Sequence, residues 1–238
     1  MAIQLVVFDM AGTTVDDQGV VNRCFRETLA QNGLAVRPEA VDGVMGLRKD
    51  DAFRAILGQT PSPLATALLG KIDIIHDDFV ERMIDFYSDD PAVKEVPGTT
   101  ALFQFLKEKG VKITLDTGFS RDIADTILDR LGWVKNGYID ASVTSDEVVN
   151  GRPHPDMIQK LMSACGVTDP KSAAKVGDAP ADLEEGLAAN CRWVIGVTWG
   201  THTRAQLERH PYTHLVDQID ELKELLASGL DPIEAYNG

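Results

Sequence analysis

Short apolar runs rich in β-branched residues recur along the chain, and each ends at a polar or glycine-containing turn. The first run covers residues 3–8 and ends at Asp9. Runs of the same kind predict further strands at residues 111–115, 141–144, 173–176 and 193–197. Strands of a parallel sheet have this composition because both of their faces are covered.

Helical periodicity fills the segments between these runs. The pattern predicts helices at residues 99–109, 121–131, 155–165 and 181–189. Strands that alternate with helices of this length favour an α/β fold, in which a Rossmann-like parallel sheet carries helices on both faces.

Residues 18–90 break this alternation, because they contain no convincing strand. Their periodicity predicts helices at residues 22–32, at 37–57 with a break near Gly46, and at 63–87. We therefore expect an inserted all-helical cap domain, residues 18–90, on a core domain of residues 1–17 and 91–238. An insert after the first strand would lie over the carboxyl ends of the strands, the edge at which open α/β sheets bind ligands. The tail from Gly229 is expected to fray.

Composition and charge narrow the possible partners. The chain has 238 residues, 44% of them apolar, which is enough for one α/β core and a smaller domain. Its formal net charge of −14 leaves no basic stripe, so we expect no nucleic-acid partner. A phosphate site in such an acidic protein must be built locally from backbone N–H groups, a few cations and a metal.

The N-terminal residues, the length of the apolar runs and the cysteines predict a cytoplasmic protein that does not contact a membrane. No apolar run approaches membrane-spanning length, and the N-terminus has no basic leader region. The cysteines, Cys24, Cys165 and Cys191, are widely spaced and form no CxxC pair, so reduced thiols are expected.

Four polar segments each follow a predicted strand. They are residues 9–14, 117–121, 151–155 and 177–182. In a parallel sheet such segments meet at one edge, where together they can carry out phosphoryl transfer. A carboxylate at Asp9 can attack phosphorus, while the backbone N–H groups of Gly12 and Thr13 can bind phosphate oxygens. Taken singly, each segment could equally be a turn or a helix cap.

The other three segments supply the remaining groups of such a site. The hydroxyl of Thr117 and the amide of Gly118 stand at a helix N-terminus, which favours anions. Arg152 offers a fixed cation against developing charge. Asp178 and Asp182 offer the oxygen ligands that Mg²⁺ prefers.

In this order the four segments resemble the four motifs of the haloacid dehalogenase (HAD) superfamily of hydrolases, over nearly the whole chain. The resemblance implies the HAD fold, a bound Mg²⁺ and an aspartyl-phosphate intermediate on Asp9. It also implies that Thr117 is the phosphate-binding hydroxyl and Arg152 the motif-three cation. The Mg²⁺ ligands that it implies are Asp9, Asp178 and the Ala11 carbonyl, with Asp182 orienting the metal site.

One position departs from ordinary HAD phosphatases and mutases. They carry a second aspartate two residues after the nucleophile, where this chain has Ala11. An alkoxide leaving group would lack its acid, at a cost of about 10²–10⁴ in rate. Residues 9–16, Asp-Met-Ala-Gly-Thr-Thr-Val-Asp, instead resemble the phosphonoacetaldehyde hydrolases (phosphonatases), which cleave a C–P bond through a Schiff base on a cap lysine.

Residues 45–49, Met-Gly-Leu-Arg-Lys, resemble the cap motif of that family, which implies Gly46 at the substrate and Lys49 as the imine former. Considered alone, Lys49 could equally be a solvated surface cation. The match is incomplete, because Ala52, Phe119 and Gly19 stand where the family has His, Tyr and Cys. These changes remove proton-handling groups, so a sister group with another substrate stays open.

The leading hypothesis is hydrolysis of phosphonoacetaldehyde or a related small carbonyl phosphonate, and the resemblance implies a possible homodimer formed through the cap. The alternative is a phosphomonoesterase acting on a small phosphate ester such as phosphoglycolate. A mutase is disfavoured by Ala11. A binding module without catalysis is disfavoured by the presence of Asp9, Arg152 and Asp178.

Overall fold

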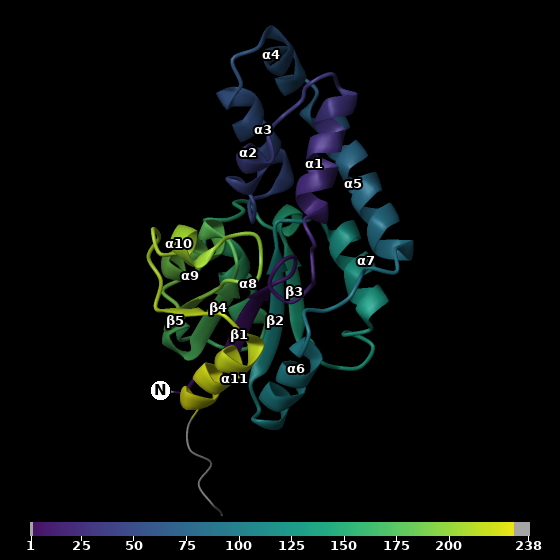
Figure 1. Ribbon diagram of the computed structural model, residues 1–238. Helices are drawn as coiled ribbons and strands as arrows, with labels where there is room; N and C mark the ends of the chain where they lie inside the picture. Colours follow the sequence, from purple (N-terminus) through teal and green to yellow (C-terminus); the bar gives the residue numbers. More distant parts are fainter. Residues whose placement is uncertain (1, 231–238) are drawn as a thin grey trace, which may run out of the picture.

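A six-stranded, all-parallel sheet forms the centre of the molecule. The computed structural model describes residues 2–230. The strands follow the order β3-β2-β1-β4-β5-β6 across the sheet (Figure 1). Their bounds are β1 Leu5–Asp9, β2 Lys112–Thr117, β3 Ala141–Thr144, β4 Ala173–Gly177, β5 Trp193–Val197 and β6 His214–Val216. The predicted α/β fold with a parallel sheet is confirmed.

Helices cover both faces of the sheet, because alternate residues of each strand point to opposite sides. Val6 and Phe8 of β1 pack into one apolar cluster with α6, α7 and α11, whereas Leu5 and Val7 pack into another with α8, α9 and α10. The core helices are α6 Thr99–Glu108, α7 Arg121–Leu131, α8 Asp156–Ala164, α9 Pro180–Ala188, α10 Arg204–Leu207 and α11 Ile219–Ser228, with 3₁₀ turns η1 Ser145–Glu147 and η2 Pro170–Ser172.

Five helices between β1 and α6 form a cap over the carboxyl ends of the strands (Figure 1). They are α1 Val20–Gln31, α2 Pro38–Asp42, α3 Lys49–Gln59, α4 Pro63–Leu69 and α5 Ile72–Asp89. Three rings hold the cap together: Phe25 stacks on Phe53 at 3.8 Å between centroids, and Phe79 meets each of them edge-on at 5.8 Å. The residue bounds of the two domains, 18–90 for the cap, stay a prediction.

The structure corrects the predicted elements at three places. The pattern at residues 63–87 is two helices, because α4 ends at Gly70 and α5 begins after Lys71. Helix α10, strand β6 and helix α11 were not predicted. The first two have four and three residues, which carry little periodicity. The tail expected to fray is fixed at its start: the N–H of Ile3 donates to the Gly229 carbonyl at 2.9 Å. Residues 231–238 of that tail lie outside the described residues.

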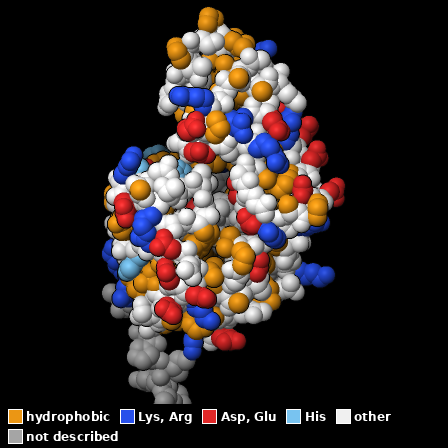
Figure 2. Space-filling model, viewed as in Figure 1, with side chains coloured by type: hydrophobic (Ala, Val, Ile, Leu, Met, Phe, Trp, Pro, Cys, Tyr) orange, Lys and Arg blue, Asp and Glu red, His pale blue; other side chains and the backbone are white. Residues whose placement is uncertain are grey.

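Charges of both signs are scattered over the visible face of the molecule, and no basic stripe runs across it (Figure 2). Within residues 2–230, no helix has the length and apolar character needed to cross a bilayer. The cysteines are all free thiols, as predicted.

Candidate active site

The carboxyl ends of the two central strands place the first site residues side by side. Asp9 ends β1 and lies opposite Asp116 of β2, so Thr117 and Gly118 follow at the same edge. The side chains of Asp9 and Thr117 are both buried. The phosphate-binding candidates of the first two motifs therefore meet where the sequence predicted.

A tight turn after β1 carries Gly12 and Thr13. Gly12 has a φ of +89°, and a Cβ there would stand 2.5 Å from Oδ2 of Asp178, so only glycine allows this approach. The backbone N–H groups of Gly12 and Thr13, predicted to bind phosphate, are instead used within the turn: they donate to the carbonyls of Val15 at 2.9 Å and Met10 at 3.2 Å. The Thr13 hydroxyl donates to Oδ1 of Asp178 at 3.1 Å. The turn therefore supports Asp178, and phosphate binding by the two amides stays a prediction.

Arg152 lies directly beneath the nucleophile candidate. Its Nη1 is 2.8 Å from Oδ1 of Asp9 and 3.0 Å from Oδ1 of Asp182. Its Nε donates to Oε2 of Glu185 at 2.9 Å, and its Nη2 pairs with Asp116. Because the guanidinium is held from three sides, Nη1 has a fixed position next to the Asp9 carboxylate.

Arg152 belongs to a buried charge cluster, which we define as Arg152, Lys175, Asp116, Asp182 and Glu185. The amine of Lys175 lies 3.1 Å from Asp182 and 3.2 Å from Glu185 and also pairs with Asp116. All of these side chains are fully buried. The cluster neutralises carboxylates that burial would otherwise destabilise.

Sequence reasoning missed Asp116, Lys175 and Glu185. Two signals were present in the chain. Lys175 is the one charged residue in the otherwise apolar strand Ala173–Gly177, and Glu185 follows Asp182 by three positions, which puts both on one face of α9. Their pairing depends on tertiary contacts that spacing alone does not reveal.

Three buried carboxylates form the candidate metal site. One oxygen each of Asp9, Asp178 and Asp182 lies within 4.8 Å of the others. Burial raises the pKa of Asp178 to about 8, with the charge of Asp9 adding to the effect, and burial together with Asp182 raises the pKa of Asp9 to about 6. Anions this close and this buried repel one another, so the donor set fits a hard divalent cation.

The surroundings of Asp182 distinguish it from the other two carboxylates. Its Oδ1 is paired with Arg152 and Lys175, and its Oδ2 accepts the backbone N–H of Ala179 at 3.1 Å. Oδ1 thus faces two cations of the protein, and Oδ2 is hydrogen-bonded to the backbone. This arrangement suits a residue that orients a metal site better than one that ligates the ion.

Lys49, the first residue of α3, points from the cap into the core. Only 4% of its surface is exposed, which is rare for a lysine. Its Nζ donates to the carbonyl of Leu47 at 3.3 Å and lies 5.2 Å from the centroid of the Phe119 ring. Burial lowers its pKa to about 8, although the charge of Asp9 acts in the opposite direction. Lys49 is therefore not a solvated surface cation.

Close contact between cap and core fixes that position. A Cβ on Gly118 would overlap the carbonyl oxygens of Leu47 and Gly46, so the cap loop rests on the bare backbone of the core. Gly46 has a φ of +83°, and its carbonyl accepts from Nη1 of Arg152 at 3.3 Å. The side chain of Arg48 donates to the core carbonyl of Val148 at 2.7 Å.

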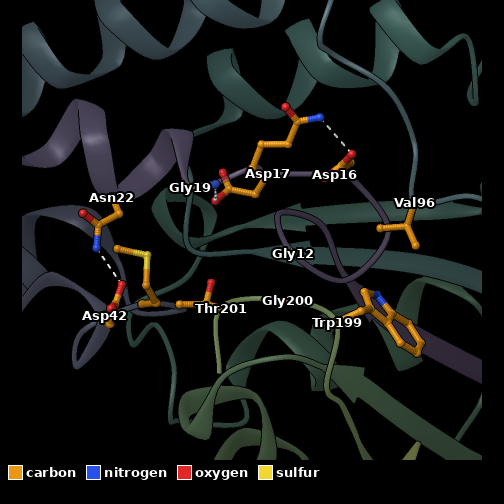
Figure 3. Close-up of a pocket in the computed structure, with 12 residues that line it drawn as sticks. Gly12, Asp16, Asp17, Gly19, Asn22, Asp42, Val96, Trp199, Gly200 and Thr201 are labelled. Carbon is orange, nitrogen blue, oxygen red and sulfur yellow. Dashed lines mark hydrogen bonds between the residues drawn. The ribbon is translucent and has the colours of Figure 1, made fainter. Parts of the chain in front are cut away.

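These residues line a small pocket of about 20 Å³, which we call the chamber. Of the predicted site residues, those that line it are Asp9, Ala11, Gly46, Lys49, Thr117, Gly118 and Asp178. Arg152 and Asp182 do not line the chamber but belong to the charge cluster beneath it, where Arg152 pairs with Asp9 and Asp182 with Lys175. Gly12 lines an adjoining cavity of about 320 Å³, shown in Figure 3, which shares Asp17, Met45 and Thr201 with the chamber.

The family profile described as haloacid dehalogenase-like hydrolase matches residues 6–196. The chain belongs to this family. It is therefore a HAD-type hydrolase. It is 32% identical over 230 residues to the phosphonoacetaldehyde hydrolase of Syntrophobacter fumaroxidans, covering 91% of this chain and 81% of that protein. It is 28% identical over 240 residues to the enzyme of the same name from Bacteroides fragilis, covering 95% and 90%.

Solved structures show the same fold. The phosphonoacetaldehyde hydrolase-like protein of Oleispira antarctica superposes with a TM-score of 0.81 at 23% identity, covering 96% of this chain and 92% of that one. A proposed phosphoglycolate phosphatase from Lactobacillus plantarum superposes with a TM-score of 0.78 at 19% identity, covering 94% and 100%. At these identities the likeness concerns the fold alone.

Proposed function

We propose that this HAD hydrolase cleaves the C–P bond of phosphonoacetaldehyde or a related small carbonyl phosphonate through an aspartyl-phosphate on Asp9. One observation supports this most: a buried lysine, Lys49, lines the same chamber as Asp9 and has its pKa lowered to about 8. A lysine can form an imine only as the neutral amine, and burial favours that form. The phosphonoacetaldehyde hydrolases among the relatives support the same substrate class.

In the proposed reaction, the Lys49 amine and the substrate carbonyl condense to an iminium with loss of water. The Asp9 carboxylate then attacks phosphorus, and the electron pair of the C–P bond moves to carbon, where the iminium takes it up as an enamine. Water hydrolyses the aspartyl-phosphate and releases phosphate. The enamine takes up a proton at carbon, and water hydrolyses the resulting iminium to the phosphorus-free carbonyl product and the free Lys49 amine. Because the leaving group is carbon and not an alkoxide, Ala11 removes no acid that this reaction needs.

Arg152 and the chamber backbone bind the phosphoryl group in this proposal. Nη1 of Arg152 already lies 2.8 Å from Oδ1 of Asp9, so it faces the place where charge develops during attack. Thr117 and Gly118 line the chamber at the tip of β2 and would hold phosphoryl oxygens. Asp9, Asp178 and the Ala11 carbonyl would hold Mg²⁺, with Asp182 orienting the site. When bound, the ion offsets the repulsion between the phosphoryl group and Asp9.

A panel of substrates tests the proposal. Phosphate release is measured from phosphonoacetaldehyde, phosphonopyruvate, phosphoglycolate and para-nitrophenyl phosphate, each with Mg²⁺ and with excess chelator. We expect phosphonoacetaldehyde or another carbonyl phosphonate to be the best substrate, and only with Mg²⁺. Fast hydrolysis of phosphoglycolate, with no phosphate released from either phosphonate, would instead establish the phosphomonoesterase. Equal rates with Mg²⁺ and with chelator would show that the reaction needs no metal ion.

A further inference from the structure

One titratable side chain in the chamber has no role in the reaction described above. Four of the residues that line the chamber can titrate: Asp9, Asp178, Lys49 and Asp17. The first attacks phosphorus, the second would hold the metal and the third would form the imine. Asp17 remains.

Asp17 is fixed at the junction between chamber and adjoining cavity, and it lines both. Figure 3 shows it in the wall of the adjoining cavity. Its Oδ2 accepts the N–H of Gly19 and its Oδ1 that of Val21, each at 3.1 Å, so the carboxylate is tied to the start of α1. Its charge acts on Lys49, whose pKa it raises against the effect of burial. The adjoining cavity is bordered by the exposed residues Gln18 and Gly19, which gives Asp17 a route to water.

The chemistry on the organic half of the substrate needs a group of this kind. Imine formation moves a proton from nitrogen to oxygen, and the enamine left by C–P cleavage must be protonated at carbon. Ala52, Phe119 and Gly19 carry no titratable group, so none of them can supply these protons. Among residues 2–230, no other carboxyl or amine side chain lines the chamber.

We propose that Asp17 is the acid–base residue for the organic half of the substrate. This inference rests on the proposed function. When the Lys49 amine adds to the carbonyl carbon, Asp17 carries the proton from nitrogen to oxygen and gives the carbinolamine. A second proton, taken by Asp17 from water, goes to the hydroxyl group, which leaves as water while the nitrogen lone pair forms the C=N bond. After C–P cleavage, a proton from Asp17 converts the enamine into a new iminium, which water hydrolyses.

The state of the Asp17 carboxyl suits this role. Burial raises its pKa above the ordinary value of an aspartate, while the N–H groups of Val21 and Gly19 act against that shift. A carboxyl with a raised pKa gives and takes protons more readily near neutral pH than an ordinary, fully ionised one.

Asp17→Asn and Asp17→Ser separate proton transfer from the structural role of tying α1. Both residues keep an oxygen that accepts backbone N–H groups at a helix start, but neither gains or loses a proton near neutral pH. We expect phosphate release from phosphonoacetaldehyde to fall by about 10²–10⁴ in both. Asp16→Asn is the matched control, since Asp16 borders only the adjoining cavity and pairs with Lys94 at 3.5 Å. Its rate should stay near that of the wild type.

Chemical rescue gives a second readout, which would not change if Asp17 had only a structural role. Asp17→Ala leaves room beside the adjoining cavity for a small acid, so added formate should restore part of the lost rate in this variant and not in wild type. Melting temperatures of all variants check that they are folded.

The outcomes separate the inference from the proposed function. If the wild type cleaves phosphonoacetaldehyde while Asp17→Asn and Asp17→Ser keep near-normal rates and formate has no effect on Asp17→Ala, Asp17 only ties down α1 and the inference is overturned alone. If the wild type neither cleaves phosphonoacetaldehyde nor forms a borohydride-reducible adduct with it, both the proposed function and the inference that rests on it are wrong.

Discussion

The buried environment of Lys49 lowers the pKa of its amine. In water a lysine amine is almost fully protonated near neutral pH, but burial against Phe119 and under the cap lowers its pKa to about 8. A substantial fraction is then a neutral nucleophile in the mildly alkaline range. At the same time Asp9, 2.8 Å from Arg152, is held ready as a carboxylate. Two side chains that could each act as a nucleophile, an amine and a carboxylate, thus share one chamber.

This arrangement predicts a particular pH dependence. The neutral form of Lys49 increases as the pH rises through about 8, so initial rates of phosphate release from phosphonoacetaldehyde should rise over that range and then level off. Hydrolysis of para-nitrophenyl phosphate, which needs no imine, is the control. It shares any pH dependence that comes from Asp178, whose pKa is also about 8, so the ratio of the two rates should still rise over this range. A flat profile for phosphonoacetaldehyde between about pH 7 and 9 would contradict a role for the neutral amine.

At the residue scale, the sequence predicts the groups that follow strands and misses those that meet only in the fold. Asp9, Thr117 and Asp178 were found because the ends of parallel strands share one edge. The pairing of Asp116 with Lys175 was not, because it depends on which strands are neighbours. The hydrogen bonds that the Gly12 and Thr13 amides make within their own turn were not predicted, because spacing does not reveal the turn geometry, and their phosphate-binding role stays a prediction.

At the element scale, the contact between the cap loop and the loop after β2 decides whether Lys49 reaches the chamber. Because Gly118 has no side chain, the carbonyls of Gly46 and Leu47 can approach its backbone. Lys49 follows two residues after Leu47, at the start of α3. A change in this contact would displace the start of α3 relative to Asp9. Sequence patterns predicted most helices of the cap, but not the break at Gly70 or the strand β6, because a single turn or three residues carry too little periodicity.

Gly118→Ala tests this contact. The new Cβ would overlap the Leu47 carbonyl oxygen, which is backbone and cannot rotate away, so the cap loop must shift. We expect kcat/KM for phosphonoacetaldehyde to fall by about tenfold or more, because small displacements of reacting groups are costly. Gly58→Ala, also a glycine-to-alanine change but inside α3 with open space around it, is the control. It should leave kcat/KM unchanged and stabilise the protein by about 0.5–1 kcal/mol. Equal kcat/KM values for both variants would show that the contact does not position Lys49.

At the scale of the whole molecule, the sheet brings charges from β2, β4, α9 and the loop before α8 into one buried charge cluster beneath the chamber. Its two cations, Arg152 and Lys175, face Asp116, Asp182 and Glu185. The cluster therefore links the stability of the core to the position of Arg152. The apolar layers on both faces of the sheet were predictable from strand composition, whereas this polar layer was not.

Removing one cation should reveal the cost of leaving these carboxylates without their partner. Lys175→Met keeps the length of the side chain but leaves Asp116 with Arg152 as its only cation, so we expect a loss of about 3–5 kcal/mol in the free energy of unfolding. Urea denaturation followed by circular dichroism measures it. Lys171→Met, an exposed lysine four positions earlier, should change the value by less than about 0.5 kcal/mol. Similar losses in the two variants would mean that the cluster contributes nothing specific.

The central claim is that the Lys49 amine becomes covalently joined to the carbonyl carbon of the substrate during turnover. The most direct measurement is borohydride reduction during turnover of phosphonoacetaldehyde, followed by peptide mapping with mass spectrometry, with Lys49→Arg as the control because a guanidinium stays charged and forms no imine. The account predicts a reduced adduct on the peptide that contains Lys49, none in Lys49→Arg, and loss of C–P cleavage in that variant. Phosphate release by the wild type without any adduct, or an adduct on a different lysine, would contradict it.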